Sequence, residues 1–188
     1  MSERKNLLRK EFKLKGETEN RSEKEKKITQ RLIKSQIFLE ADVVFLYAAL
    51  NNELSVDEIA LEAERLKKKT AFPLCEDENG KMKFYFTELK NLKKGMYGIR
   101  EPDKLKSEKA VFTEKSLCIV PGLAFGIKGE RLGKGKGYYD RFLSEFTGKT
   151  VGLSFEDRIS DSIPMEKHDV KIDYLATENK IYKTDKEE

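Results

Sequence analysis

Short apolar runs alternate with amphipathic helical segments along this chain, and that alternation constrains the fold more than any other feature. Val43 to Ala48 is a compact apolar run of the kind that forms a strand buried on both faces. Leu117 to Val120 and Val151 to Ser154 are similar runs, and segments with helical periodicity separate the runs. This order predicts an α/β fold with a mostly parallel central sheet flanked by helices.

The elements follow one another without an internal repeat or a low-complexity linker. We therefore expect a single domain over residues 1–188, frayed at its last few residues, and 188 residues is the size of one ordinary domain. We expect helices near residues 4–15, 22–39, 55–68 and 138–146, and strands near residues 43–48, 70–74, 82–86, 117–120, 151–154, 174–176 and 180–183. Pro73 is expected to break the second strand, with a turn at 77–80, an extended loop at 95–102 and a glycine-rich loop at 126–137.

The charge balance excludes one large class of function. The 38 basic and 34 acidic side chains leave a formal net charge of only +4, whereas a dedicated nucleic-acid binder carries a lopsided basic footprint. The longest apolar run, Val43 to Leu50, is far shorter than the ~20 residues of a membrane-spanning helix. We expect a cytoplasmic monomer with neither nucleic acid nor membrane as a partner.

The two cysteines, Cys75 and Cys118, are far apart and form no metal-binding spacing. Each adjoins or lies within an apolar run. We therefore expect both to be buried, reduced thiols.

A run of glycines and lysines at residues 133–137, just before the 138–146 helix, is the segment most suggestive of chemistry. Glycines leave the backbone free of Cβ atoms, so its N–H groups can approach phosphates closely, and the lysines add positive charge. The start of the helix adds the positive end of its dipole. Asp140 is placed to reach a magnesium ion that bridges such phosphates. A flexible, solvated loop is the alternative, but the two tyrosines before Asp140 are unusual in a tether.

The same segment carries a family resemblance. The string Pro-Gly-Leu-Ala-Phe at residues 121–125, followed by Arg-Leu-Gly-Lys-Gly-Lys-Gly-Tyr-Tyr-Asp at 131–140, resembles the signature of the 5-formyltetrahydrofolate cyclo-ligases. Gly-Ile-Arg-Glu-Pro at 98–102 and His-Asp-Val-Lys-Ile-Asp at 168–173 resemble two further elements of that family. The fold that this resemblance implies is a single α/β domain similar to the sugar-phosphate isomerase and CoA-transferase group.

The resemblance implies an enzyme that uses ATP and magnesium to convert 5-formyltetrahydrofolate, with or without a polyglutamate tail, into 5,10-methenyltetrahydrofolate. By similarity, Asp140 and Asp173 bind the metal, and Glu53 binds the folate together with Lys134 and Tyr138. Arg131, Lys136 and Tyr138 are the implied catalytic residues. The implied ATP-binding residues are Lys5, Arg9, Arg131, Gly133, Lys134, Gly135, Lys136, Gly137, Tyr138 and Tyr139.

Several alternatives stay open at this point. One alternative function is that of a non-catalytic nucleotide- or folate-binding module that kept the phosphate loop, and another is that of an RNA-associated protein. Lys5 and Arg9 are equally typical of a solvated helix face, Glu53 of a helix flank, and Asp173 of a surface acid. His168, the only histidine, is expected to have a packing role, and Arg100 stands where the family pattern suggests an uncharged residue.

Overall fold

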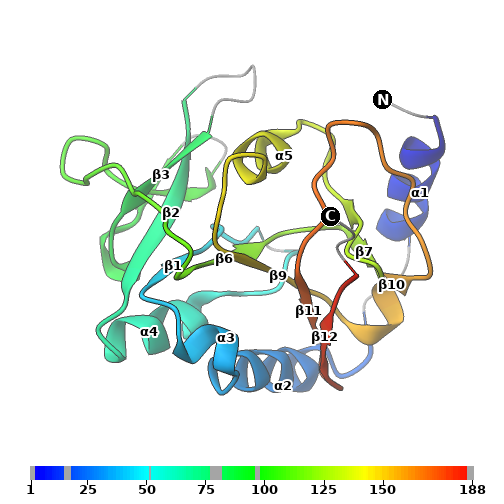
Figure 1. Ribbon diagram of the computed structural model, residues 1–188, viewed down its shortest axis with the longest axis horizontal. Helices are drawn as coiled ribbons and strands as arrows, with labels where there is room; N and C mark the ends of the chain where they lie inside the picture. The colour runs from blue at the N-terminus through cyan, green and yellow to red at the C-terminus, as the bar shows by residue number, and fades with distance from the viewer. Residues whose placement is uncertain (1–2, 15–17, 51, 77–81, 96–97, 186–188) are drawn as a thin grey trace.

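The computed structural model describes residues 3–14, 18–50, 52–76, 82–95 and 98–185. Its centre is a seven-stranded sheet in the order β12-β11-β9-β6-β1-β2-β3 (Figure 1). The inner neighbours are parallel, whereas the edge strands β12 and β3 are antiparallel to theirs, so the predicted α/β class is confirmed. The seven strands are β1 (Val43–Phe45), β2 (Lys69–Cys75), β3 (Met82–Phe86), β6 (Ser116–Val120), β9 (Lys149–Leu153), β11 (Tyr174–Ala176) and β12 (Ile181–Lys183).

Both faces of this sheet are covered, which explains why its strands are continuous apolar runs. Val44 and Leu46 pack into one core, while Phe45, between them, packs into the other. Helices α2 (Arg21–Ile33), α3 (Gln36–Leu39) and α4 (Asp57–Arg65) lie on the first face, and α5 (Tyr138–Leu143) lies on the second (Figure 1). The single helix expected at 22–39 is wrong, because the chain turns extended at Ser35 between α2 and α3.

A cluster of phenylalanines fills the second core. Phe45 is fully buried, and its ring lies 5.2 Å from that of Phe84 and 5.4 Å from that of Phe146 in edge-to-face geometry. Phe84 and Phe142 are closer still, at 4.5 Å between centroids. These contacts seat the short helix α5 on the sheet, and α5 follows the glycine–lysine segment directly.

Pro73 does not break β2, contrary to expectation. The strand continues to Cys75, and Pro73 pairs with Phe84 of the antiparallel neighbour β3. Proline lacks an N–H and is tolerated in a strand where one side needs no donor. The pairing with β1 ends at Ala71, so β2 has a single neighbour at Pro73.

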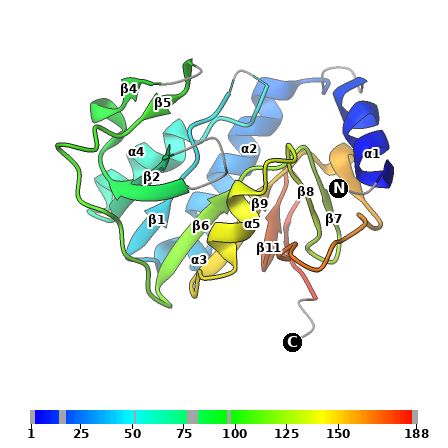
Figure 2. The ribbon, with the colours of Figure 1, turned by 90° about the horizontal axis from the view of Figure 1, so that it is seen from above.

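The loops expected at 95–102 and 126–137 contain small strands. β4 (Lys93–Lys94) and β5 (Arg100–Glu101) form a hairpin, while β7 (Ala124–Gly126) pairs with β8 (Arg131–Leu132) and with β10 (Ile159–Ser160). Helix α1 (Glu3–Leu14) lies beside this β7–β8–β10 sheet, at the opposite end of the molecule from the β4–β5 hairpin (Figure 2). Residues 127–130 form the turn between β7 and β8, and residues 133–137 form the loop between β8 and α5. The turn expected at 77–80 and the residues after Asp185 lie outside the described residues.

Two single-turn 3-10 helices, Leu89–Asn91 and Glu156–Arg158, complete the described elements. No helix in the described part of the chain combines the length and the hydropathy that a membrane span requires.

The phenylalanine cluster gives a stability prediction. Phe45→Ala should lower the free energy of unfolding by about 3–5 kcal/mol, because it removes a fully buried ring and leaves a cavity. Urea unfolding followed by circular dichroism measures this loss. Leu105→Ala is the control: Leu105 is 96% exposed, so its truncation should change stability by less than about 0.5 kcal/mol. Equal effects of the two substitutions would contradict the assigned core.

Candidate active site

A cavity of about 370 Å³ opens at the carboxyl ends of β1, β2 and β6. Ligands of open α/β sheets bind at this edge, because the loops that follow parallel strands converge there. All predicted site residues except Asp173 line the cavity, although they come from three separate segments of the chain. They are Lys5, Arg9, Glu53, Arg131, Gly133, Lys134, Gly135, Lys136, Gly137, Tyr138, Tyr139 and Asp140.

The charges on the cavity wall are balanced. Five basic and five acidic side chains line it, which suits a ligand that brings both anionic groups and N–H donors. The basic residues are Lys5, Arg9, Arg131, Lys134 and Lys136, and the acidic ones are Glu53, Glu101, Asp140, Glu166 and Asp169.

Glycines shape the loop at residues 133–137. Gly135 and Gly137 have φ values of 98° and 68°, in the left-handed region that other residues rarely adopt. At Gly133 an added Cβ would lie 2.7 Å from a terminal nitrogen of Arg131. The glycines therefore let the loop turn tightly over Arg131 and lead into α5, in addition to any backbone contact they offer a ligand.

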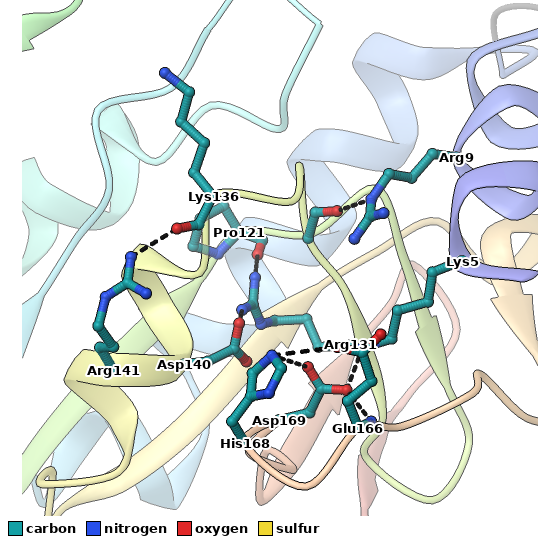
Figure 3. Close-up of polar contacts among 11 residues, drawn as sticks. Lys5, Arg9, Pro121, Arg131, Lys136, Asp140, Arg141, Glu166, His168 and Asp169 are labelled. Atoms are coloured by element: carbon teal, nitrogen blue, oxygen red, sulfur yellow. Dashed lines mark hydrogen bonds and ion pairs between the residues drawn. The ribbon is translucent and has the colours of Figure 1, made fainter. Parts of the chain in front are cut away.

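A buried ion pair lies beneath this loop. Arg131 Nη2 donates to Asp140 Oδ2 at 2.9 Å, and Arg131 Nη1 donates to the Pro121 carbonyl at 3.2 Å (Figure 3). The two charged side chains are only 5% and 15% exposed. Low exposure strengthens their attraction and makes loss of either partner costly.

Two buried polar atoms in the cavity wall have no hydrogen-bond partner among the described residues: Arg131 Nε and the Tyr139 hydroxyl. The guanidinium carbon of Arg131 lies 5.7 Å from the Tyr139 ring centroid. Burial raises the pKa of Tyr139, so its hydroxyl stays neutral and keeps its proton. An unsatisfied buried donor costs about 1–3 kcal/mol. A ligand oxygen or an ordered water that accepts from these atoms would remove this cost.

Helix α1 brings two cations to the cavity. Lys5 is 4% exposed and forms an ion pair with Asp169, 164 residues away (Figure 3). Arg9 Nε donates to the Gly133 carbonyl at 2.8 Å. Phe12 anchors the same helix in a small core that includes Leu132 of β8. The alternative of a solvated helix face is therefore wrong for Lys5.

Glu53 faces the loop from the other wall. Its Oε2 accepts from the Leu50 N–H at 2.9 Å, and its Oε1 lies 2.5 Å from Lys134 Nζ. The structure thus brings together two residues that the resemblance assigns to folate binding. Tyr47 closes the wall behind them, with its hydroxyl donating to the Leu54 carbonyl at 2.6 Å. Glu53 is not merely a helix flank.

The segment 166–169 contributes residues that the sequence prediction did not assign. Burial alone would raise the pKa of Asp169, but a hydrogen bond from the Glu166 N–H and the ion pair with Lys5 lower it. His168 Nε2 lies 3.4 Å from Glu166 Oε2, and the imidazole is 69% exposed (Figure 3). The His-Asp pair of the matched 168–173 element was the available signal for this wall of the cavity.

Asp173 lies elsewhere. Its Oδ2 accepts from both the N–H and the hydroxyl of Thr150, at 2.8 and 2.7 Å, where β9 and β11 begin. The cavity is at the opposite, carboxyl edge of the same sheet. The structure therefore does not bring Asp173 together with Asp140 at the cavity wall. The described residues contain no cluster of three or more His, Cys, Asp or Glu side chains suited to a metal.

Arg100, the residue that departs from the family pattern, contacts α4 and does not line the cavity. It forms a two-pronged ion pair with Asp57 at the start of α4, with Nη1 at 3.0 Å from Oδ2. Its neighbours Ile99 and Glu101 line the cavity instead. Successive side chains along β5 point to opposite faces, so Arg100 points away from the cavity and is not part of its wall.

Several known proteins resemble this chain in sequence and in fold. Residues 1–178 match the model of the 5-formyltetrahydrofolate cyclo-ligase family. The chain belongs to this family. A probable 5-formyltetrahydrofolate cyclo-ligase of Caenorhabditis elegans is 30% identical over 177 residues, covering 87% of this chain and 84% of the relative. A 5,10-methenyltetrahydrofolate synthetase structure from Aquifex aeolicus superposes with a TM-score of 0.82 at 28% identity, covering 98% of this chain and 94% of the other.

Family membership makes the chain a 5-formyltetrahydrofolate cyclo-ligase. The cavity that gathers the predicted residues is its candidate active site. A mitochondrial cyclo-ligase of Arabidopsis thaliana is also similar, at 28% identity over 188 residues, 84% of this chain and 66% of the relative. One member of the family is thus named as mitochondrial, and the expected cytoplasmic location stays a prediction.

The expectation that both cysteines are buried is wrong for Cys75. Cys118 is buried, but Cys75 is exposed at the end of β2 and lines the cyclo-ligase cavity. The apolar run that suggested burial ends where β2 reaches the cavity. Partial burial, then the nearby Glu101, raise the pKa of Cys75, against a hydrogen bond from Tyr138 and the charge of Lys136.

This difference predicts one reactive thiol in the folded cyclo-ligase. Ellman's reagent should modify Cys75 alone, with a rate that keeps rising above about pH 9, because only the thiolate reacts and partial burial raises its pKa above the ordinary thiol value of about 8.5. Denaturant should release Cys118 as a second thiol. Cys75→Ser should abolish the native reaction and Cys118→Ser should preserve it. Two fast native thiols, or a plateau below pH 9, would contradict this arrangement.

Proposed function

We infer that the protein closes the ring of 5-formyltetrahydrofolate in an ATP- and magnesium-dependent reaction, giving 5,10-methenyltetrahydrofolate, ADP and phosphate. The observation that carries this proposal is the cavity itself. It places a carboxylate suited to a pterin, Glu53, opposite a glycine–lysine loop suited to phosphates. Family membership supplies the folate and the ligase chemistry.

The phosphate end of the cavity is the cationic one. Lys5 and Arg9 reach it from α1, and Lys134 and Lys136 reach it from the loop. The unpartnered Arg131 Nε adds a buried donor. Phosphoryl transfer requires mainly positioning and charge stabilisation from a protein, and this set of side chains supplies both.

The folate end centres on Glu53. A carboxylate accepts well from the adjacent amino and ring N–H donors of a pterin. Because the Leu50 N–H fixes one oxygen of Glu53, the other can face a ligand in a defined direction. Tyr138 lines the cavity directly after the loop, and we assign it to the region between the two ends.

Magnesium fits with a single protein carboxylate. The ion usually takes one or two carboxylates together with phosphate oxygens and water, so a cluster of acids is unnecessary. Asp140 lines the cavity and is the residue we assign to it, without Asp173. When bound, the ion neutralises charge on the transferring phosphoryl group.

The proposed chemistry has two steps. The formyl oxygen on N5 attacks the γ-phosphorus of ATP, the bond to the bridging oxygen breaks, and ADP leaves with that electron pair. N10 then adds to the activated formyl carbon and loses its proton, and the C–O bond breaks to release phosphate. Both reacting atoms of the second step belong to one molecule, so positioning by the cavity contributes much of the rate. Arg131, Lys136 and Tyr138 are the side chains we assign to charge stabilisation around the reacting groups.

A non-catalytic nucleotide- or folate-binding module is the alternative. Such a module would tolerate loss of Glu53 or Asp140, yet both are present and line the cavity beside the lysines. We also propose a cytoplasmic monomer without nucleic-acid or membrane partners, and a substrate that is free or polyglutamylated.

The deciding experiment is an absorbance assay in the near ultraviolet for the methenyl product. Purified protein is mixed with 5-formyltetrahydrofolate, with and without ATP and magnesium. A rise that needs both additions supports the proposal. No rise from folded protein that still binds ATP would leave the binding module as the better description.

Asp140→Asn should reduce kcat by roughly 10²-fold or more, because it removes the carboxylate placed for magnesium and for Arg131. Raising the magnesium concentration should recover part of the activity. Circular dichroism should show that the fold is kept. Asp161→Asn, an exposed acid outside the cavity, is the control. Wild-type turnover by Asp140→Asn at limiting magnesium would rule out the metal assignment.

Glu53→Gln tests the folate end. We expect KM for 5-formyltetrahydrofolate to rise roughly ten-fold or more, with a smaller change in KM for ATP, because a charged acceptor becomes a neutral one. Steady-state kinetics with each substrate varied in turn give both values. Glu58→Gln, an exposed change on α4, should leave both constants unchanged. A selective rise in KM for ATP would reverse the assigned ends.

A further inference from the structure

The ion pair between Glu53 and Lys134 joins the two proposed ends of the cavity. Its atoms are 2.5 Å apart, and both residues line the cavity. We assign Glu53 to the pterin donors, and we assign Lys134, which the resemblance places with both ligands, to the phosphates. While the two side chains are paired, each blocks the other from its ligand.

The two partners differ in their freedom to move. Glu53 is held through its carboxylate by the Leu50 N–H and through its carbonyl by Arg21, at 2.9 and 2.8 Å. Its side chain is 13% exposed. Lys134 is 42% exposed and lies between Gly133 and Gly135 on the loop. The lysine is thus the mobile partner and the glutamate the fixed one.

A poorly exposed carboxylate cannot lose its cation without a replacement, because an unpaired charge there is costly. The pterin offers neutral donors and must compete with a full positive charge. Nucleotide phosphates change this competition, because they offer Lys134 several negative charges on its own side of the cavity. Lys134 then moves to the phosphates, and Glu53 becomes available.

We propose that Lys134 couples the two ligand ends: it occupies Glu53 until nucleotide phosphates draw it away, so that nucleotide binding increases folate affinity. This inference rests on the proposed function, since it takes the phosphates and the pterin as the two ligands. Lys134 is then a positioning and specificity residue that limits folate binding without nucleotide. By linkage, folate increases nucleotide affinity by the same factor.

The test measures folate binding rather than turnover. Isothermal titration calorimetry gives Kd for 5-formyltetrahydrofolate, with and without magnesium and a non-hydrolysable ATP analogue. The wild type should bind folate roughly five-fold or more tightly when the analogue is present, within the usual range of coupling between sites. Lys134→Met should bind folate without the analogue as tightly as the wild type does with it, and the analogue should then have almost no effect.

Lys128→Met is the matched control. Lys128 is an exposed lysine in the β7–β8 turn and does not line the cavity, so this variant should keep the coupling of the wild type. Because Lys134→Met leaves the poorly exposed Glu53 without its cation, thermal unfolding is measured to show that the variant still folds. Coupling that survives in Lys134→Met, folate binding weakened by that change under both conditions, or no coupling in the wild type would each overturn the inference.

Failure of the proposed function gives a different result. Coupled binding without ATP-dependent formation of the methenyl product would refute the reaction but keep the exchange of partners at Lys134. Product formation by a wild type that shows no coupling would refute the exchange alone.

Discussion

The parallel pairing of β1 with β2 and β6 is the constraint on which the site depends. It sends the ends of all three strands to one edge, so that the loop containing Glu53, the end of β2 and the segment after Val120 converge. The sheet is buried on both faces by separate cores, which makes the strands rigid supports. The cavity consequently has fixed walls, and the lysine-bearing loop is its most adaptable part.

Electrostatics within the cavity follow one pattern. Arg131 pairs with Asp140, Lys134 with Glu53, and Lys5 with Asp169. Pairing stabilises each charge in the absence of ligand and keeps the side chains near the positions where ligands would meet them. The cavity is therefore highly charged yet nearly neutral, a state that the small net charge of the whole chain does not reveal.

The large elements were predictable because their signals are local. Apolar runs identified the strands, and the glycine–lysine string identified the phosphate loop before any neighbour was known. Other features depend on tertiary partners. Pro73 stays in its strand because β1 ends earlier, and the two residues of β8 are too few for a periodic pattern. Asp169 and Asp173 are close in sequence, yet the turn into β11 places only Asp169 on the cavity wall. The spacing of these two acids in the sequence does not show which of them lines the cavity.

The ion pair between Lys5 and Asp169 also has a consequence for synthesis of the protein. One wall of the cavity comes from the first helix and the facing contact from a segment near the end of the chain. Chains emerge from the ribosome with the N-terminus first, so α1 must wait for almost the whole protein before its buried lysine meets Asp169. The nascent chain consequently cannot form a complete cavity until the segment around Asp169 has left the ribosome.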